Sequence, residues 1–260
     1  MAWLDLVLPL LARLSHGWHL TYTRGFACPE VVDHALSNQP TGSGRLGLWA
    51  ERWFLRQPHW RALRAVQSEI EARLEALCQR RRSYGLETFV LDFGYGCGRY
   101  AWKLIERGEI LSLLCLRRQP NEISLGRAKL PSASRRHVEF QIGDRLDPAS
   151  FLMAREPDVA IFLGPAASFS TSADLECFFS LTFRCLCPGG VFFFGAVEVP
   201  GPSRKLRHGE RACDQATYIL RHTGFQQIRS LETGSSAQLL ESWKGLTTAH
   251  RPGDSSAGAS

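Results

Sequence analysis

The sequence predicts an α/β fold, a doubly wound and mostly parallel sheet of seven strands with a helical N-terminal extension. Three observations carry this prediction. Short apolar runs alternate with helix-like stretches over residues 87–245, a glycine-rich loop follows the first run, and two strand-like runs joined by Gly-Ser-Ser close this region. Strands that alternate with helices at this interval form βαβ units and a parallel sheet. The last two runs predict a hairpin, so one strand should run antiparallel.

Residues 1–86 form the first region and are predicted to be largely helical. They hold five of the seven tryptophans, and Asn38 to Gly44 is a loop rich in Gly, Pro and Ser. Between residues 60 and 82 the apolar side chains recur at steps of three and four, as in an amphipathic helix: Trp60, Leu63, Val66, Ile70, Leu74 and Leu77.

Residues 87–245 form the second region and contain the predicted sheet. Apolar runs indicate strands at 88–93, 110–116, 137–142, 158–163, 191–194, 226–232 and 237–243. Helices are expected after residue 101 and at 121–130, 175–186 and 208–223. The third region, residues 246–260, has the composition of a disordered tail.

Composition excludes several classes of protein. A chain of 260 residues with 44% hydrophobic residues and a net charge of +6 is neither collagen-like nor wholly disordered. No apolar run reaches the ~20 residues that cross a bilayer. The apolar start carries Asp5 and has no basic residue ahead of it, which does not fit a signal peptide. Residues 1–20 are expected to pack on the domain, and peripheral contact of this segment with a membrane is the alternative.

The positive charge is concentrated in the first half. Residues 1–140 carry 20 basic and 13 acidic side chains, net +7, whereas residues 141–260 carry 11 and 12, net −1. The basic first half of the chain could bind nucleic acid, anionic lipid or an anionic substrate. The sequence contains no recognisable RNA-binding module, so we do not expect a nucleic-acid partner. The eight cysteines form no CxxC pair, which predicts free thiols in a cytoplasmic protein rather than disulfides or a zinc site.

The loop Gly94-x-Gly96-x-Gly98 lies between a predicted strand and a predicted helix. Glycines there allow positive φ and let a ligand approach the backbone at the head of the sheet. The loop does not match the dinucleotide fingerprint G-x-G-x-x-G, and the Gly-Lys-Ser/Thr of a phosphate loop is absent. On its own this motif is a weak indication of a nucleotide-like ligand.

The order of motifs around the loop is more specific. Val90-Leu-Asp92 precedes the glycines, Phe140-Gln-Ile-Gly-Asp144 ends the third strand, and Pro188-Gly-Gly190 precedes the fifth. With the terminal hairpin, this order resembles the class I S-adenosylmethionine-dependent methyltransferases over residues 87–245. The resemblance implies the strand order 3-2-1-4-5-7-6 with an antiparallel strand seven, and S-adenosylmethionine as cofactor.

The resemblance also implies which residues hold the cofactor. The glycines would lie against its methionine part, Asp92 would orient it directly or through water, and Asp144 would meet the adenine amino group. The cofactor-binding set implied at the strand ends is Asp92, Gly94, Gly96, Gly98, Arg118, Asp144, Arg145 and Leu163.

The chain departs from the family pattern at two strand ends. Strand two normally ends in an acid that accepts both ribose hydroxyls, but here Arg117 and Arg118 stand there and the next acid is Glu122. We expect one of the two arginines beside the pocket. Substitution of the missing acid by Glu122 from the next turn is the less favoured alternative. Residues 163–169 after strand four offer no carboxylate and no Asn/Asp-Pro-Pro-aromatic motif, so no catalytic residue is assigned. Glu198 and His208 lie where substrate groups often sit, but we expect each of them to be a surface residue.

A narrower resemblance covers residues 13 to 245. Gly98-Arg-Tyr100, Gly126-Arg-Ala128 and the loop from Asn38 to Gly42 are similar to a bacterial methyltransferase family often joined to an α/β-hydrolase domain. The leading hypothesis is therefore an S-adenosylmethionine-dependent methyltransferase that acts on a small-molecule or lipid-like substrate, with residues 1–86 as a lid. The alternative is a catalytically degenerate protein that keeps the fold and binds ligands only.

Overall fold

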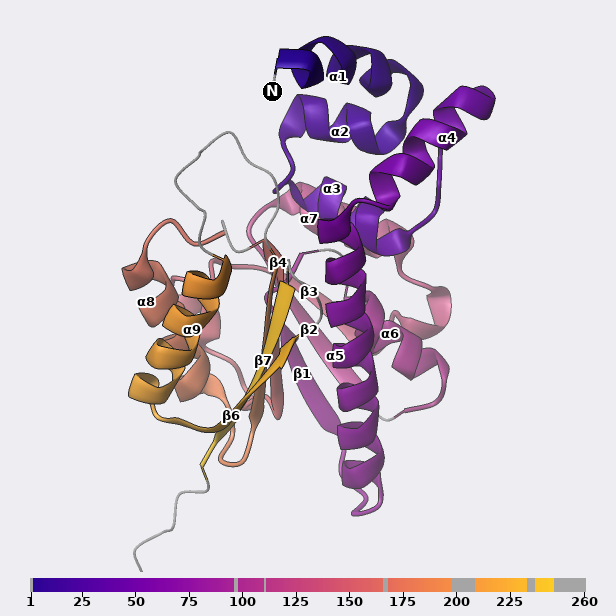
Figure 1. The fold of residues 1–260 in the computed structure, drawn as a ribbon. Helices are drawn as coiled ribbons and strands as arrows, with labels where there is room; N and C mark the ends of the chain where they lie inside the picture. The colour runs from indigo at the N-terminus through magenta and orange to yellow at the C-terminus, as the bar shows by residue number, and fades with distance from the viewer. Residues whose placement is uncertain are drawn as a thin grey trace, which may run out of the picture.

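A seven-stranded sheet in the order β3-β2-β1-β4-β5-β7-β6 forms the centre of the computed structural model (Figure 1). The structure describes residues 2–95, 98–109, 111–165, 168–197, 209–232 and 237–245. The strands are β1 (Thr88–Asp92), β2 (Leu111–Arg117), β3 (Val138–Ile142), β4 (Val159–Pro165), β5 (Val191–Val197), β6 (Phe225–Glu232) and β7 (Ala237–Lys244). β1 to β5 pair in parallel, and β7 runs antiparallel to both β5 and β6. The predicted fold class, strand order and reversed strand seven are confirmed.

The burial of the strands follows their sequences. Every position of β4 and β5 is buried, and both strands read as unbroken apolar runs, as expected for strands covered on both faces. β3 lies at the sheet edge, and its exposed Glu139 and Gln141 alternate with the buried Val138 and Phe140.

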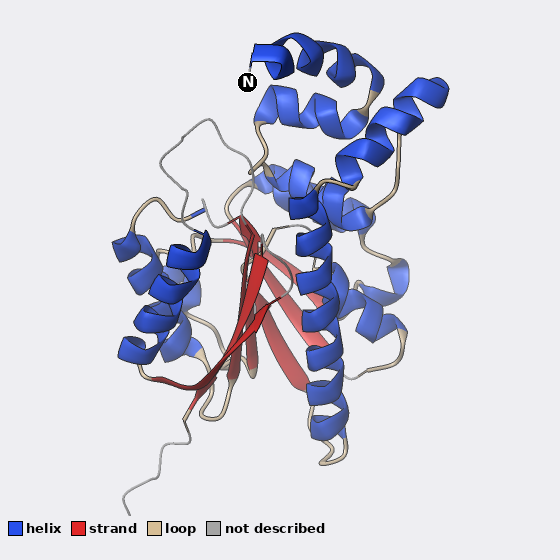
Figure 2. Ribbon diagram, in the orientation of Figure 1, coloured by secondary structure: helices blue, strands red, loops and turns tan. Residues whose placement is uncertain are grey.

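Helices cover both faces of the sheet (Figure 2). α8 (Ser172–Cys185) and α9 (Gly209–Thr223) lie on one face, and α5 (Pro58–Arg82), α6 (Arg99–Glu106) and α7 (Pro120–Lys129) lie on the other. Each face has its own core: Val90, Leu113, Ile161 and Phe193 point toward α5–α7, whereas Leu91, Leu114, Phe162 and Phe194 point toward α8 and α9. The alternation along each strand therefore divides the interior into two layers.

The long helix α5 runs antiparallel to the parallel strands. Near its end Arg81 pairs with Asp158, which precedes β4, and further back Arg73 pairs with Glu241 of β7. Val66 packs closely on Gly195 of β5, because a Cβ added to Gly195 would lie 2.7 Å from Val66 Cγ1. The beginning of α5 therefore lies at the edge of the sheet where β1 to β5 end, which is where open α/β sheets bind ligands.

Four further helices lie beyond that edge and precede α5: α1 (Ala2–Leu14), α2 (His16–Arg24), α3 (Pro29–Ser37) and α4 (Gly44–Leu55). The buried carboxylate of Glu51 in α4 holds them together, because it accepts hydrogen bonds from the Ser15 hydroxyl and the Gly17 amide and pairs with His34. Burial works against ionisation, but these three partners outweigh it and lower the pKa of Glu51.

Several sequence predictions can be compared directly with these elements. The predicted helix at 60–82 is α5, and its stripe from Trp60 to Leu74 is buried. The six cysteines whose side chains are described are free thiols. No helix in the described ranges is long and apolar enough to cross a membrane. The predicted disordered tail at 246–260 lies outside the described residues, and the division of the chain at residue 86 stays a prediction.

Candidate functional site

The glycine loop starts where β1 ends and is fixed to the neighbouring strand β4. The Gly94 amide donates to Asp92 Oδ1 at 2.9 Å, and the Tyr95 amide donates to the Leu163 carbonyl at 2.8 Å. A Cβ on Gly94 would lie 2.9 Å from both the amide nitrogen and the carbonyl oxygen of Leu163. Gly98 has φ 65° at the N-cap of α6, a conformation that favours glycine. Leu163 thus positions the loop through its backbone.

Asp92 and Arg117 form an ion pair beneath this loop. Arg117 Nη2 lies 2.5 Å from Asp92 Oδ2, and Nη1 donates to the Asp92 carbonyl at 2.9 Å. The Tyr100 hydroxyl donates to the other carboxylate oxygen. Burial and the adjacent Asp92 carboxylate raise the pKa of Tyr100, and the same carboxylate outweighs the burial of Arg117 and raises its pKa. Asp92 is fully buried, so it can affect a ligand only through the loop that it supports.

A small cavity of about 40 Å³ opens beside this pair. Gly94, Arg118 and Arg145 of the predicted set line it, together with Phe93, Tyr95, Leu116, Arg117, Glu122 and Gly143. Asp92, Gly98, Asp144 and Leu163 do not line it, and Gly96 lies outside the described residues. Pockets for small organic ligands usually measure ~300–1,000 Å³, so a nucleoside would need this cavity to widen.

The rim of the cavity offers a way to widen it. Arg118 Nη2 lies 3.0 Å from Asp144 Oδ2, and the two side chains are 58% and 36% exposed. An exposed ion pair contributes little stability and can part at low cost. The two residues predicted near the cofactor therefore contact each other across the ends of β2 and β3.

Glu122 is the acidic side chain that faces the cavity. It occupies the first turn of α7, where the helix dipole favours a negative charge. No hydrogen bond or ion pair of its carboxylate occurs among the described residues. Burial raises its pKa despite Arg117, Arg118 and Arg145 nearby. A carboxylate with free acceptor oxygens can accept hydrogen bonds from both hydroxyls of a diol. Glu122 is the nearest acid in the sequence after Arg117 and Arg118, which stand where the family places its ribose-binding acid.

Arg145 is buried and turns toward the end of β4 instead of toward Asp144. Its guanidinium donates to the Ser168 carbonyl at 2.6 Å and lies 4.7 Å from the ring centroid of Phe169. It also lies 5.5 Å from the ring of Phe162. Arg145 therefore supports the segment after β4 and also lines the cavity.

The helices before α5 close over the same end of the sheet. Asp33 of α3 is buried and pairs with Lys129 of α7 and, at 3.9 Å, with Arg99 of α6. Asn121 of α7, one residue before Glu122, donates to Glu30 of α3 at 3.4 Å. Helix α3 thus covers the start of α7 and the approach to the cavity.

His59 is a residue that the sequence analysis missed. It lies two helical turns before Val66 on the same face of α5, which places it about 10 Å further along the axis, beyond the end of β5. It packs against the rings of Phe26 and Trp60, and its Nε2 atom has no hydrogen-bond partner among the described residues. Burial lowers its pKa to about 4, so the ring is neutral at pH 7. Its only sequence signal is its place on the buried stripe of α5. Glu198 and His208 lie outside the described residues.

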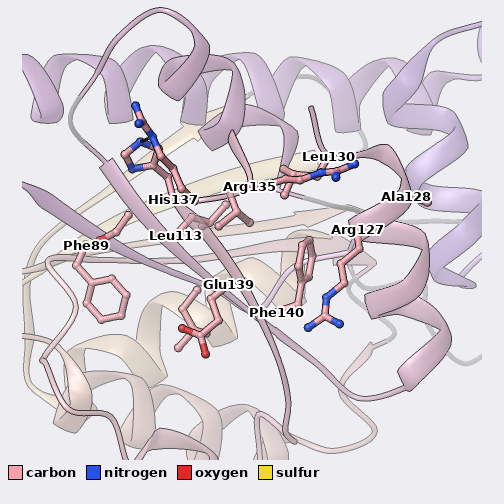
Figure 3. Close-up of a pocket in the computed structure, with 13 residues that line it drawn as sticks. Phe89, Leu113, Arg127, Ala128, Leu130, Arg135, His137, Glu139 and Phe140 are labelled. Atoms are coloured by element: carbon pink, nitrogen blue, oxygen red, sulfur yellow. Dashed lines mark hydrogen bonds between the residues drawn. The ribbon is translucent and has the colours of Figure 1, made fainter. Parts of the chain in front are cut away.

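A larger cavity of about 850 Å³ lies beside the same three strands, β1 to β3, but near their starts (Figure 3). It surrounds the start of the edge strand β3 and is lined on one face by Phe140 and Arg127 and on the other by Phe89 and Glu139. Because it wraps around the edge of the sheet, away from the glycine loop, we do not assign the cofactor to it.

Comparison with known proteins identifies the family. Residues 2–196 match the family model described as "Putative methyltransferase". This match covers most of the chain, and the protein belongs to that family. The protein YnbC of Escherichia coli (strain K12) is 24% identical over 189 residues, which are 71% of this chain and 32% of YnbC. The chain thus spans about a third of the length of this curated relative.

Solved structures of methyltransferases match this chain at low sequence identity. CalS10, an amino pentose methyltransferase from Micromonospora echinaspora solved with S-adenosylmethionine, matches with a TM-score of 0.49 and 15% identity, over 68% of this chain and 91% of its own. The glycopeptide N-methyltransferase MtfA with S-adenosylmethionine matches with a TM-score of 0.46 and 16% identity, over 64% and 86%.

Proposed function

We propose that the protein transfers a methyl group from S-adenosylmethionine to a small-molecule or lipid-like acceptor, in the cytoplasm. The observation that carries this proposal is the glycine loop, fixed by Leu163 and Asp92 at the ligand-binding edge of a sheet with a reversed seventh strand. Membership of a methyltransferase family supports it. The free thiols support a reducing compartment.

Once the small cavity widens, the residues around it would bind separate parts of the cofactor. Glu122 would accept hydrogen bonds from the ribose hydroxyls, and the loop at Gly94 would lie against the methionine part. Asp92 and Leu163 would hold that loop in place, and Asp144 would reach the adenine once its pair with Arg118 has parted. When bound, the cofactor supplies an electrophilic methyl group on a sulfonium.

Alignment of the acceptor with that methyl group is the main task of the remaining residues, because a displacement of this kind depends on orientation. Residues 1–86 would act as the lid that excludes water. His59 is neutral and lies beyond the end of β5, and its Nε2 atom has no hydrogen-bond partner among the described residues, so it would form a hydrogen bond with the acceptor.

The second candidate is a degenerate member of the family that binds ligands without turnover. Arg117 in place of the usual acid and the narrow cavity favour it. The two candidates are distinguished by titrating S-adenosylmethionine into the protein and then following a radiolabelled methyl group into cell extracts of small molecules and lipids. Cofactor binding with labelled product supports the enzyme. Cofactor binding without any labelled product supports the degenerate protein.

A further inference from the structure

Helix α4 exposes an unusual outer face. Gly47, Ala50, Glu51, Phe54 and Leu55 form its buried side. The opposite side, which we call the α4 outer face, consists of Arg45, Leu46, Trp49, Arg52 and Arg56 at the C-cap. Figure 1 shows α4 at the far end of the lid, beyond the edge of the sheet where the glycine loop lies.

Two large apolar side chains on this face are open to solvent. Leu46 is 72% exposed and Trp49 is 63% exposed, and they lie one turn apart. Within the part of the chain that the structure describes, Trp49 stacks only on the half-buried Trp53, with ring centroids 6.3 Å apart. Helix α1, which packs against α4, also exposes Leu10. Neighbouring exposed apolar residues of this size mark contact sites more often than isolated ones do.

The charge on the same face has a single sign. Arg45, Arg52 and Arg56 are exposed, and none of them forms an ion pair with another described residue. The one acid of α4, Glu51, is fully buried and engaged by Ser15, Gly17 and His34. The face thus carries three positive charges and no compensating negative charge within the helix.

We propose that the α4 outer face binds the surface of an anionic lipid bilayer. Arginines flanking Trp and Leu on one side of a helix are the pattern of interfacial helices, in which the rings enter the headgroup region and the cations meet anionic lipids. A purely electrostatic partner such as nucleic acid would leave Leu46 and Trp49 unexplained.

This binding would bring the lid, and with it the ligand-binding edge of the sheet, to the membrane. The sequence suggested a membrane contact through residues 1–20, and the exposed residues instead assign it to α4. The inference goes beyond methyl transfer and does not require it, because binding to lipid can be measured without turnover.

The test is co-sedimentation of the full chain with large unilamellar vesicles of phosphatidylcholine alone or with 40% phosphatidylglycerol. The proposal expects binding to the anionic vesicles to be at least ~10-fold stronger than to neutral ones, and to weaken at high salt. The variants are Leu46→Ser/Trp49→Ser and Arg45→Gln/Arg52→Gln/Arg56→Gln. The control Tyr84→Ser/Leu152→Ser removes equally exposed apolar residues, 73% and 81% exposed, which lie elsewhere on the molecule.

Each α4 variant should lose about 10-fold or more in binding to anionic vesicles while its thermal melt is unchanged, and the control should bind like the parent. Equal binding by parent and α4 variants would overturn the proposal, as would no preference for anionic vesicles. If the parent instead forms concentration-dependent dimers that Trp49→Ser abolishes, a second copy of the chain covers this face and the lipid proposal is wrong.

Discussion

Arg117 and Asp92 form a fully buried ion pair that joins the ends of β2 and β1 beneath the glycine loop. Arg117 stands in the sequence where related enzymes place the acid for the ribose, yet its guanidinium points inward to Asp92. The arginine that departs from the family pattern thus supports the loop, and Glu122 faces the cavity.

The first prediction concerns the stability of this pair. Arg117→Met leaves the buried Asp92 carboxylate without its counter-ion and should lower the free energy of unfolding by about 3–5 kcal/mol. Adding Asp92→Asn removes the unpaired charge and should restore much of the loss. Urea denaturation measures both variants. Arg118→Met, which breaks only an exposed pair, should change stability by no more than ~1 kcal/mol. A similar small loss for Arg117→Met would show that the buried pair does not support the fold.

The second prediction concerns the contact between the loop and β4. Gly94→Ala places a methyl group 2.9 Å from backbone atoms of Leu163, which cannot yield as a side chain can. We expect a stability loss of about 1–3 kcal/mol and weaker cofactor binding. Gly85→Ala is the control, because its Cβ meets nothing and only its positive φ is strained. If Gly94→Ala binds S-adenosylhomocysteine with the same affinity as the parent and the Gly85→Ala control, the glycine loop is not the cofactor site.

The third prediction concerns Glu122. Glu122→Gln should weaken binding of S-adenosylmethionine and S-adenosylhomocysteine alike, by about 10- to 100-fold, the scale of hydrogen bonds to a charged group. Because the folded state raises the pKa of Glu122, its ionisation opposes folding as pH rises past that pKa. The variant should therefore be no less stable than the parent at pH 7. Calorimetry and thermal melts check the two effects, with Glu106→Gln on the exposed side of α6 as control. A variant that binds both ligands normally would place the ribose elsewhere.

The fourth prediction concerns acid sensitivity. The folded state lowers the pKa of His59 to about 4, so between pH 6.5 and 4 the unfolded chain binds a proton that the folded chain does not. This difference should cost the parent ~3 kcal/mol of stability as pH falls through that window. His59→Leu should remove this part of the loss, whereas substitution of the exposed His19 should not. Parallel pH profiles of parent and His59→Leu would contradict the buried neutral ring.

The sequence predicted the sheet well because each strand carries its own apolar pattern and the hairpin follows from two adjacent runs. The alternation of Leu113 and Leu114, for example, directly sets the two core layers. Contacts between the side chains of different strands were harder to predict. Nothing in the sequence around Arg117 indicates that its guanidinium pairs with the carboxylate of Asp92, 25 residues away. His59 looked like one more residue of an amphipathic helix, because its missing partner is visible only once Phe26 and Trp60 surround it.

We propose that this protein binds S-adenosylmethionine at the glycine loop between β1 and α6. Isothermal titration of S-adenosylhomocysteine into the parent, Gly94→Ala and Glu122→Gln proteins tests it most directly. If the cofactor binds at the glycine loop, we expect one saturable site per chain in the parent and weaker binding in both variants. No saturable binding by the folded parent up to millimolar ligand, or equal affinity in all three proteins, would contradict it.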